Sequence, residues 1–392
     1  MFKKRSVNFM WNINENTIRV TEYDVLGELP DPFLFDDGGR VRTKEDWEKR
    51  RAEIYKTAVE LQYGEIPPEP EVLKVETAYA GGKGGANSYR ITAGTRGKTL
   101  TFMMKLFLPK TGDKFPVIVS GDMCFNYCFN EEYRAAMLDN GIAFAVFDRT
   151  SLADDKRTDP THTGPIFDVY PDLDFGSVAA WAWGYSRCVD ALLATGLIDE
   201  NCIVFTGHSR GAKTAMLAGV LDKRAAIVNP NETNAGSCAC YRIHMKAECE
   251  DGVVRRSEQL SDLAVNYPGW IGSGMQEYKD RENDLPFDCH FLKALVAPRV
   301  LFVSEAASDL WGNPIGSWQT SVAAKEVYKF LGAEDNICWY FRNGFHYHKP
   351  EDILQLVNVI KHFRGEEELN DKYFKQPFKE PELIFDWKCP EK

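Results

Sequence analysis

Residues 202–221, CIVFTGHSRGAKTAMLAGVL, decide how the rest of the chain is interpreted. The first four residues are apolar and β-prone, typical of a buried strand, whereas the residues after the motif favour a helix. Between them lies GHSRG (207–211), a G-x-S-x-G motif placed where a strand turns sharply into a helix. Its glycines permit a tight turn that exposes the hydroxyl of Ser209. The stretch therefore predicts a nucleophilic serine, with the backbone N–H of Arg210 facing the oxyanion formed on an attacked carbonyl.

The same residues offer a second interpretation. Gly207 and Lys213-Thr214 have the spacing of the phosphate-binding loop G-x-x-x-x-G-K-[ST]. Ala212 stands where that loop requires glycine, and its Cβ would crowd bound phosphates. A nucleophile is therefore the preferred interpretation, and nucleotide binding is the alternative.

The composition narrows the class of protein. The 392 residues are 44% hydrophobic, which is enough to bury the core of one large α/β domain. A net charge of -11 and a pI near 5.3 argue against a nucleic-acid partner. We find no apolar run of about 18 residues that would span a membrane, and we expect a soluble monomer.

Cysteines and the first residues bear on metals and on location. The ten cysteines lack the paired C-x2-C spacings of a zinc site, so we expect buried thiols and no metal. Met1-Phe2-Lys3-Lys4-Arg5 is basic, but the polar residues that follow interrupt any apolar stretch of a signal peptide. The sequence as written favours the cytoplasm, and secretion after removal of a signal is the alternative.

The order of predicted elements indicates the fold. Three strands at 71–79, 88–93 and 99–108 suggest an antiparallel opening of a mixed sheet. Short apolar strands then alternate with helices, as in a parallel sheet with crossover connections. We predict one α/β-hydrolase domain over residues 1–392, a three-layer sandwich with a mostly parallel central sheet. We expect three decorations, which are an N-terminal arm at about 1–45, a roofing insertion at about 236–290 and a C-terminal tail at about 365–392.

A serine hydroxyl needs a histidine base, and the histidine needs a carboxylate that orients it. In α/β-hydrolases these residues follow strands in the chain order Ser, acid, His. Of seven histidines, only His346 and His348 lie in the loop before the closing helix, where the base is expected. Glu232 and Asp309 each follow a predicted strand in the allowed order. Glu232 is favoured as the orienting acid, with Asp309 as the second candidate or a shared support.

These segments resemble the glucuronoyl esterases, which cleave esters between glucuronic acid on xylan and lignin alcohols. The resemblance is carried by GHSRGAK (207–213), by NETNAGSCACYR (231–242), by Ala297-Pro298-Arg299 and by Asp309-Leu310-Trp311. In the loop at 344–350, the residue that matches the family's histidine is His346 rather than His348.

The resemblance implies a role for each matching residue. Ser209 would be the nucleophile, His346 the base and then the acid, Glu232 the usual orienting acid, and Asp309 an alternative acid. The substrate contacts that it implies involve Arg210 at the oxyanion, Lys213 at sugar hydroxyls, Trp311 packed on the sugar, and Glu248 and Gln259 as further polar contacts.

The resemblance also implies a partner and leaves alternatives. The substrate would be a glucuronate ester or glucuronoxylan, and no cofactor or metal is implied. The alternatives are an acetyl xylan esterase or other carbohydrate deacetylase, and a non-catalytic carbohydrate-binding relative. Tyr267-Pro268-Gly269-Trp270 replaces a Phe-Pro-His-Trp pattern of the family, and this departure bears on the substrate more than on the triad.

Overall fold

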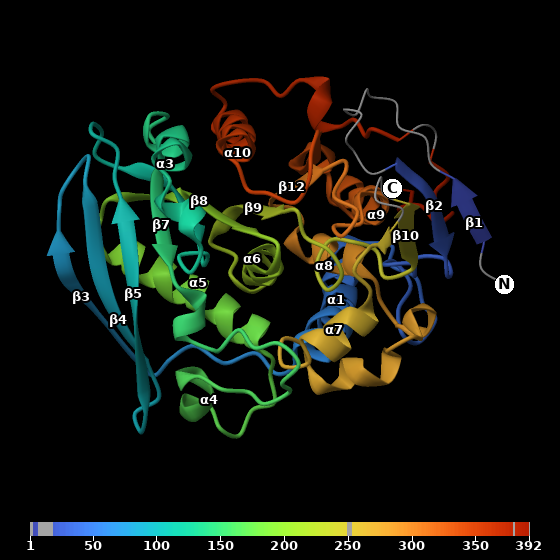
Figure 1. The fold of residues 1–392 in the computed structure, drawn as a ribbon, viewed down its shortest axis with the longest axis horizontal. Coiled ribbons are helices and arrows are strands. Elements are labelled where there is room, and N and C mark those ends of the chain that lie inside the picture. Colours follow the sequence, from blue (N-terminus) through green and yellow to red (C-terminus); the bar gives the residue numbers. More distant parts are fainter. Residues whose placement is uncertain (1–2, 7–18, 249–252, 379–380, 392) are drawn as a thin grey trace.

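The structure is a computed structural model that describes residues 3–6, 19–248, 253–378 and 381–391 (Figure 1). In this part of the chain one large mixed sheet runs through the molecule, with the strand order β13-β12-β9-β8-β6-β7-β5-β4-β3. The strands in that order are β13 (Ile337–Arg342), β12 (Val300–Ala306), β9 (Ala225–Asn231), β8 (Ile198–His208), β6 (Phe115–Ser120), β7 (Ala143–Phe147), β5 (Thr99–Phe107), β4 (Ala86–Gly94) and β3 (Val72–Ala80).

The direction of the strands agrees with the sequence pattern. The first six strands of the order are parallel neighbours, whereas β5, β4 and β3 are joined to them and to each other antiparallel. The predicted antiparallel opening and the mostly parallel sheet are therefore confirmed. Parallel strands end at the same edge of a sheet, so the loops after β8, β9, β12 and β13 meet there.

Helices cover both faces of the sheet, which gives the three layers expected (Figure 1). Side chains alternate along β6, so that Val117 and Val119 enter one core while Ile118 enters the other. The core around Ile118 is closed by α3 (Glu131–Leu138) and α10 (Pro350–Phe363). The larger core is closed by α1 (Lys44–Tyr55), α5 (Ser177–Ala194), α6 (Arg210–Leu221), α8 (Cys289–Val296) and α9 (Pro314–Leu331).

The arm and the insertion meet in a second, four-stranded sheet. It has the order β1-β2-β10-β11, with β1 (Lys3–Ser6), β2 (Arg19–Val25), β10 (Ile243–Glu248) and β11 (Val254–Arg256). The sequence pattern did not predict this pairing, because the strands are short and far apart in the chain. Parts of the expected arm and tail, at 1–2, 7–18, 379–380 and 392, lie outside the described residues.

Several helices were not predicted. The largest is α9, whose start has the Asn313-Pro314 signal of a helix and whose end has Gly332 in the left-handed conformation. The helical spacing from Trp47 to Leu61 predicts the run formed by α1, η1 (Lys56–Glu60) and α2 (Leu61–Tyr63). The other helices that were not predicted are short, and they are α8, η2 (Asn126–Phe129), η3 (Arg149–Ser151), α4 (Pro165–Val169), α7 (Leu260–Asn266), η4 (Ser273–Tyr278), η5 (Glu282–Asp284), η6 (Glu334–Asn336) and η7 (Asp371–Tyr373).

Two further expectations concern thiols and membranes. In the part of the chain that the structure describes, the cysteines are free thiols and most of them are buried. Cys249 lies outside the described residues. Within the described ranges, no helix combines the length and the apolar character needed to cross a membrane.

Buried histidines make the fold sensitive to acid. The ring of His290 is fully buried, its Nε2 donates to Pro30 O at 2.9 Å, and burial lowers its pKa to about 4. The unfolded chain therefore binds a proton below about pH 6.5, where the folded chain does not. Stability is lost as the pH falls through this window.

We expect His290→Gln, which keeps a donor for Pro30, to reduce this loss. The fall in melting temperature between pH 7 and pH 5 should be smaller in the variant than in the parent. His362→Gln is the matched control, because that ring is partly exposed in the folded chain and should leave the fall unchanged. An equal fall in parent and His290→Gln would contradict the prediction.

Candidate active site

The predicted sharp turn is present at Ser209, which lies between β8 and α6. Ser209 has φ 58° and ψ -118°, a left-handed conformation that a non-glycine residue rarely adopts. Its backbone N–H donates to Asn231 O at 3.0 Å. A Cβ at Gly207 would overlap the backbone carbonyl of Gly211, and one at Gly211 would overlap the carboxylate of Asp122. Both glycines of the motif are therefore required by the packing of the turn.

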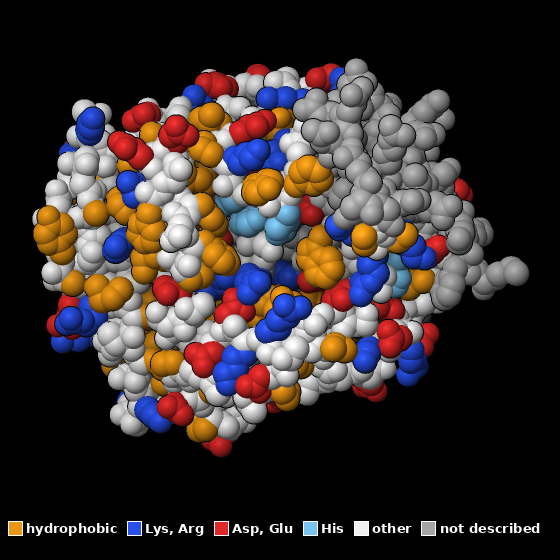
Figure 2. All heavy atoms as spheres, viewed as in Figure 1, with side chains coloured by type: hydrophobic (Ala, Val, Ile, Leu, Met, Phe, Trp, Pro, Cys, Tyr) orange, Lys and Arg blue, Asp and Glu red, His pale blue; other side chains and the backbone are white. Residues whose placement is uncertain are grey.

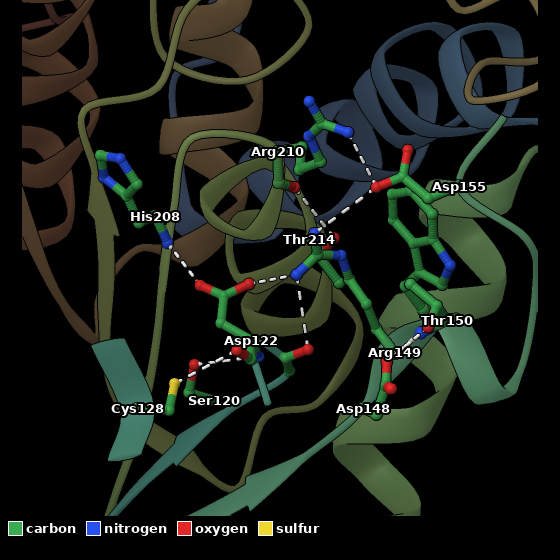
Figure 3. A network of polar contacts seen from close by, with 12 residues as sticks. Ser120, Asp122, Cys128, Asp148, Arg149, Thr150, Asp155, His208, Arg210 and Thr214 are labelled. Carbon is green, nitrogen blue, oxygen red and sulfur yellow. Dashed lines mark hydrogen bonds and ion pairs between the residues drawn. The ribbon is translucent and has the colours of Figure 1, made fainter. Parts of the chain in front are cut away.

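A buried carboxylate holds this turn from below (Figure 3). Asp122 Oδ2 accepts a hydrogen bond from the backbone N–H of His208 at 2.8 Å, one residue before the serine. Asp122 also accepts from Tyr127 Oη and pairs with Arg149 Nη1, and the side chains of Asp122 and Arg149 are fully buried. Arg149 thus compensates the charge that Asp122 carries into the core.

The predicted base, His346, lies at the same turn. The centroid of its ring is 4.5 Å from that of His208, the residue before Ser209. Its Nδ1 lies 2.7 Å from Asp309 Oδ2. A proton on Nδ1 donates to this carboxylate and leaves the lone pair on Nε2, the tautomer that a general base requires. The two side chains on which the sequence hypothesis depended are therefore in one region of the molecule.

Both candidate acids reach the histidine, but at different distances. Glu232 Oε2 is 3.5 Å from His346 Nδ1, compared with 2.7 Å for Asp309. Glu232 already pairs with Arg342 Nη2 and accepts from the backbone N–H of Tyr347 at 2.8 Å. Burial raises the pKa of Glu232, although Arg342 acts against this rise. The sequence pattern favoured Glu232, whereas Asp309 makes the shorter contact with Nδ1, and the Glu232 carboxylate pairs with Arg342 at the end of β13.

The second histidine of the loop, His348, packs against the aromatic rings behind His208. Its ring stacks on His208 with centroids 5.4 Å apart, and it packs against the rings of Tyr127 and Tyr133. Its Nδ1 lies 3.3 Å from Tyr133 Oη, and burial lowers its pKa to about 3. His348 therefore stays neutral and packs behind His208.

The side chain of Arg210, the residue after the serine, is held by one acid and two aromatic rings. Its Nη1 donates to Asp155 Oδ2 at 2.9 Å, and its guanidinium lies over the rings of Trp270 and Tyr267 at 4.9 and 5.5 Å. The backbone N–H of Arg210 is in the first turn of α6, where helical N–H groups have no partner within the helix. Asp155 was not predicted, although it lies in the loop at 150–175 that has the composition of a cleft-forming segment.

A cavity of about 370 Å³ opens beside the histidine, and the predicted sugar contact Trp311 forms part of its wall with 39% of its surface exposed. Histidine side chains gather in a hollow on the face shown in Figure 2. The residues that line the cavity are Val254, Arg255, Arg256, Ser308, Asp309, Leu310, Trp311, Phe345 and His346.

The other predicted substrate contacts are Lys213, Gln259 and Glu248. The side chain of Lys213 is only 3% exposed, and its ammonium donates to Asn234 Oδ1, Ala235 O and, at 2.8 Å, Glu258 Oε2. All three of its donors therefore have protein acceptors, and this geometry does not favour the predicted contact with sugar hydroxyls. Gln259 is the N-cap residue of α7. Glu248 ends β10, and its side chain lies outside what the structure describes.

One set of donors in the described part of the chain could approach a metal ion. His208, Glu232 and His346 each offer a nitrogen or oxygen within 4.8 Å of the others. This donor set is one that zinc accepts, but Arg342 pairs with Glu232, and its positive charge disfavours a cation there. The expectation that no metal is bound stays a prediction.

Comparison with known proteins agrees with this geometry. Residues 82–332 match the family described as fungal glucuronyl esterase. A 4-O-methyl-glucuronoyl methylesterase of Schizophyllum commune is 31% identical over 315 residues, which are 79% of this chain and 75% of that protein. A carbohydrate esterase family 15 glucuronoyl esterase from Caldicellulosiruptor kristjansonii has a TM-score of 0.80 at 30% identity, over 93% of this chain and 98% of that chain. A serine mutant of the Sporotrichum thermophile glucuronoyl esterase, solved with methyl 4-O-methyl-beta-D-glucopyranuronate, has a TM-score of 0.71 at 26% identity over 87% and 88% of the two chains.

The two acids can be separated by the reactivity of Ser209. We expect Asp309→Asn to slow labelling of Ser209 by a fluorophosphonate probe by at least about 100-fold, because the imidazole loses the charge that fixes its tautomer. Glu232→Gln should slow labelling less and should mainly lower the melting temperature, since Arg342 is left without its buried partner. Asp335→Asn, on the exposed surface, is the control. A larger loss from Glu232→Gln than from Asp309→Asn would restore the order that the sequence favoured.

The buried ammonium gives a separate prediction. Lys213→Met leaves the Glu258 carboxylate buried without its partner, so we expect the free energy of unfolding to fall by about 3 kcal/mol in chemical denaturation. Lys223→Met, at an exposed position, should leave it unchanged. A variant of normal stability with weakened substrate binding would instead support a direct contact with the sugar.

Proposed function

Because the chain belongs to the glucuronoyl esterase family, we propose that it hydrolyses the ester that joins the carboxyl group of 4-O-methyl-glucuronic acid on xylan to a lignin alcohol. The observation that carries the proposal is the strained Ser209 turn with the His346 and Asp309 pair beside it. This arrangement is that of a serine esterase.

The reaction proceeds in two acyl-transfer steps. His346 Nε2 accepts the proton of Ser209 Oγ as this oxygen attacks the ester carbonyl. Asp309 stabilises the imidazolium that forms, through the 2.7 Å contact with Nδ1. The imidazolium then gives the proton to the leaving alkoxide, and the alcohol departs. Water, deprotonated by the same imidazole, then attacks the acyl carbon. The imidazolium returns this proton to Ser209 Oγ as the acyl–oxygen bond breaks, which releases the uronic acid and restores the serine.

The oxyanion of each tetrahedral intermediate faces Arg210. Its backbone N–H lies at the start of α6, where the helix dipole also favours negative charge. Its guanidinium lies beside the same turn and adds a full positive charge. A single preorganised donor of this kind is usually worth roughly 2.7 to 4 kcal/mol of barrier lowering.

The cavity beside His346 suits a sugar ring. Trp311 offers a partly exposed aromatic face, which packs well against the apolar face of a pyranose. The shorter contact of Asp309 supports it as the main orienting acid, with Glu232 as a second carboxylate fixed by Arg342. The chemistry of every step is supplied by side chains and backbone groups of the chain itself.

Substrate choice is tested by comparing two esters. We expect the purified protein to hydrolyse benzyl glucuronate, and Ser209→Ala to lose this activity by a factor of about 1,000 or more while still folding. Acetylated xylan, assayed in parallel, should be a poor substrate. Turnover of the acetyl ester alone would indicate a deacetylase. Sugar binding without turnover of either ester in the parent would indicate a non-catalytic relative.

A further inference from the structure

A chain of four alternating charges connects the serine turn to the loop after β7 (Figure 3). Asp122 accepts from the His208 backbone and pairs with Arg149, whose Nη2 lies 3.7 Å from Asp155 Oδ2. Asp155 Oδ2 in turn accepts from Arg210 Nη1 at 2.9 Å. We propose that Asp155 is a positioning residue that fixes the guanidinium of Arg210 where the oxyanion forms, an inference that rests on the proposed esterase function.

The two oxygens of Asp155 are engaged by two different elements. Oδ1 accepts from the indole N–H of Trp270 at 3.2 Å, while Oδ2 accepts from Arg210. The carboxylate is 15% exposed, so it is largely shielded from water. The bond from Trp270 therefore orients the Asp155 carboxylate independently of its contact with Arg210.

The backbone before Asp155 is also held in place. Ala153 O accepts from Trp181 Nε1 at 2.8 Å, and Asp154 O accepts from Ser177 Oγ at 3.2 Å. Both donors come from α5, a core helix, and the Asp154 N–H donates to Thr163 O at 2.8 Å across the loop. The loop therefore presents Asp155 from a rigid support, although loops at a surface are usually mobile.

Arg210 needs such a partner, because its own side chain is long and 32% exposed. Its guanidinium lies over Trp270, whose ring stacks on Tyr267 with centroids 3.8 Å apart. The two rings contact the guanidinium, and the charge-assisted bond to Asp155 adds a contact that depends on its direction. A charge that is already oriented stabilises an oxyanion without reorganisation during the reaction.

Asp155 also has an effect that opposes catalysis. Its negative charge offsets part of the positive charge of Arg210, so its removal would increase the field at the oxyanion if the guanidinium stayed in place. Within the described residues, one charge-assisted bond and two ring contacts orient Arg210, and therefore we expect the loss of orientation to prevail.

Asp155→Asn tests the proposal, with benzyl glucuronate as substrate. Complete loss of one oxyanion donor costs about 100- to 1,000-fold in kcat. We expect the looser Arg210 of Asp155→Asn to cost about 10-fold in kcat, with less than about a 3-fold change in KM. Asp172→Asn, at an exposed position of the same loop, is the matched control and should keep the kcat of the parent. An unchanged or raised kcat in Asp155→Asn would overturn the proposal.

A double-mutant cycle separates positioning from a structural effect. In the Arg210→Ala background, Asp155→Asn should reduce kcat by less than about 2-fold, because the residue through which it acts is absent. Two losses that multiply would show that Asp155 acts elsewhere and would reject the proposal. If Asp155→Asn folds poorly, Asp155→Glu, which keeps the charge but moves the carboxylate by one methylene, should give a smaller fall in kcat that also disappears in Arg210→Ala.

The rate at which a fluorophosphonate labels Ser209 allows the proposed substrate and the positioning role of Asp155 to be tested separately. A parent that is labelled but does not turn over benzyl glucuronate contradicts the proposed substrate, while the cycle can still be measured on labelling. A parent that turns over the ester and shows no coupling between Asp155 and Arg210 contradicts the positioning role alone.

Discussion

The contact between the Asp122 carboxylate and the backbone N–H of His208 is the constraint on which the site depends. A carboxylate in the core is costly unless its charge and its lone pairs are matched. Arg149 matches the charge, Tyr127 and the His208 backbone match the lone pairs, and Gly211 leaves the space that the carboxylate occupies. The strained conformation of Ser209 persists because Asp122 fixes the backbone of His208 before it and Asn231 O accepts from its own backbone N–H.

The other half of the site is built on the ends of three neighbouring strands. β9 ends just before Glu232, β12 ends just before the loop of Asp309, and β13 ends at Arg342 before the loop of His346. The carboxylates of Glu232 and Asp309 converge on one imidazole, and Arg342 pairs with both Glu232 and Asp352. One guanidinium thus compensates two buried acids, which leaves Asp309 as the carboxylate with the shorter contact to the base.

Much of this arrangement follows from the sequence, because it depends on patterns that are local. The strand, the G-x-S-x-G motif and the helix are adjacent in the chain, so the turn at Ser209 was predictable. The position of His346 before the closing helix follows from the order of elements in the fold. The distances from Glu232 and Asp309 to His346 depend on Arg342, whose partners lie far apart in sequence, and no periodicity encodes them. The family resemblance implies a substrate contact for Lys213, but its burial depends on Asn234, Ala235 and Glu258, which only the folded chain brings near.

The small sheet links the start of the chain, through β2 and β10, to one wall of the cavity beside His346. β11, which supplies Val254 and Arg256 to the cavity wall, is hydrogen-bonded to β10, and β10 is hydrogen-bonded to β2. One wall of the cavity therefore takes its position, through two rows of main-chain bonds, from residues 19–25 near the start of the chain. A substitution within residues 19–25 can therefore shift this wall, and with it the shape of the cavity, without altering any residue that lines it.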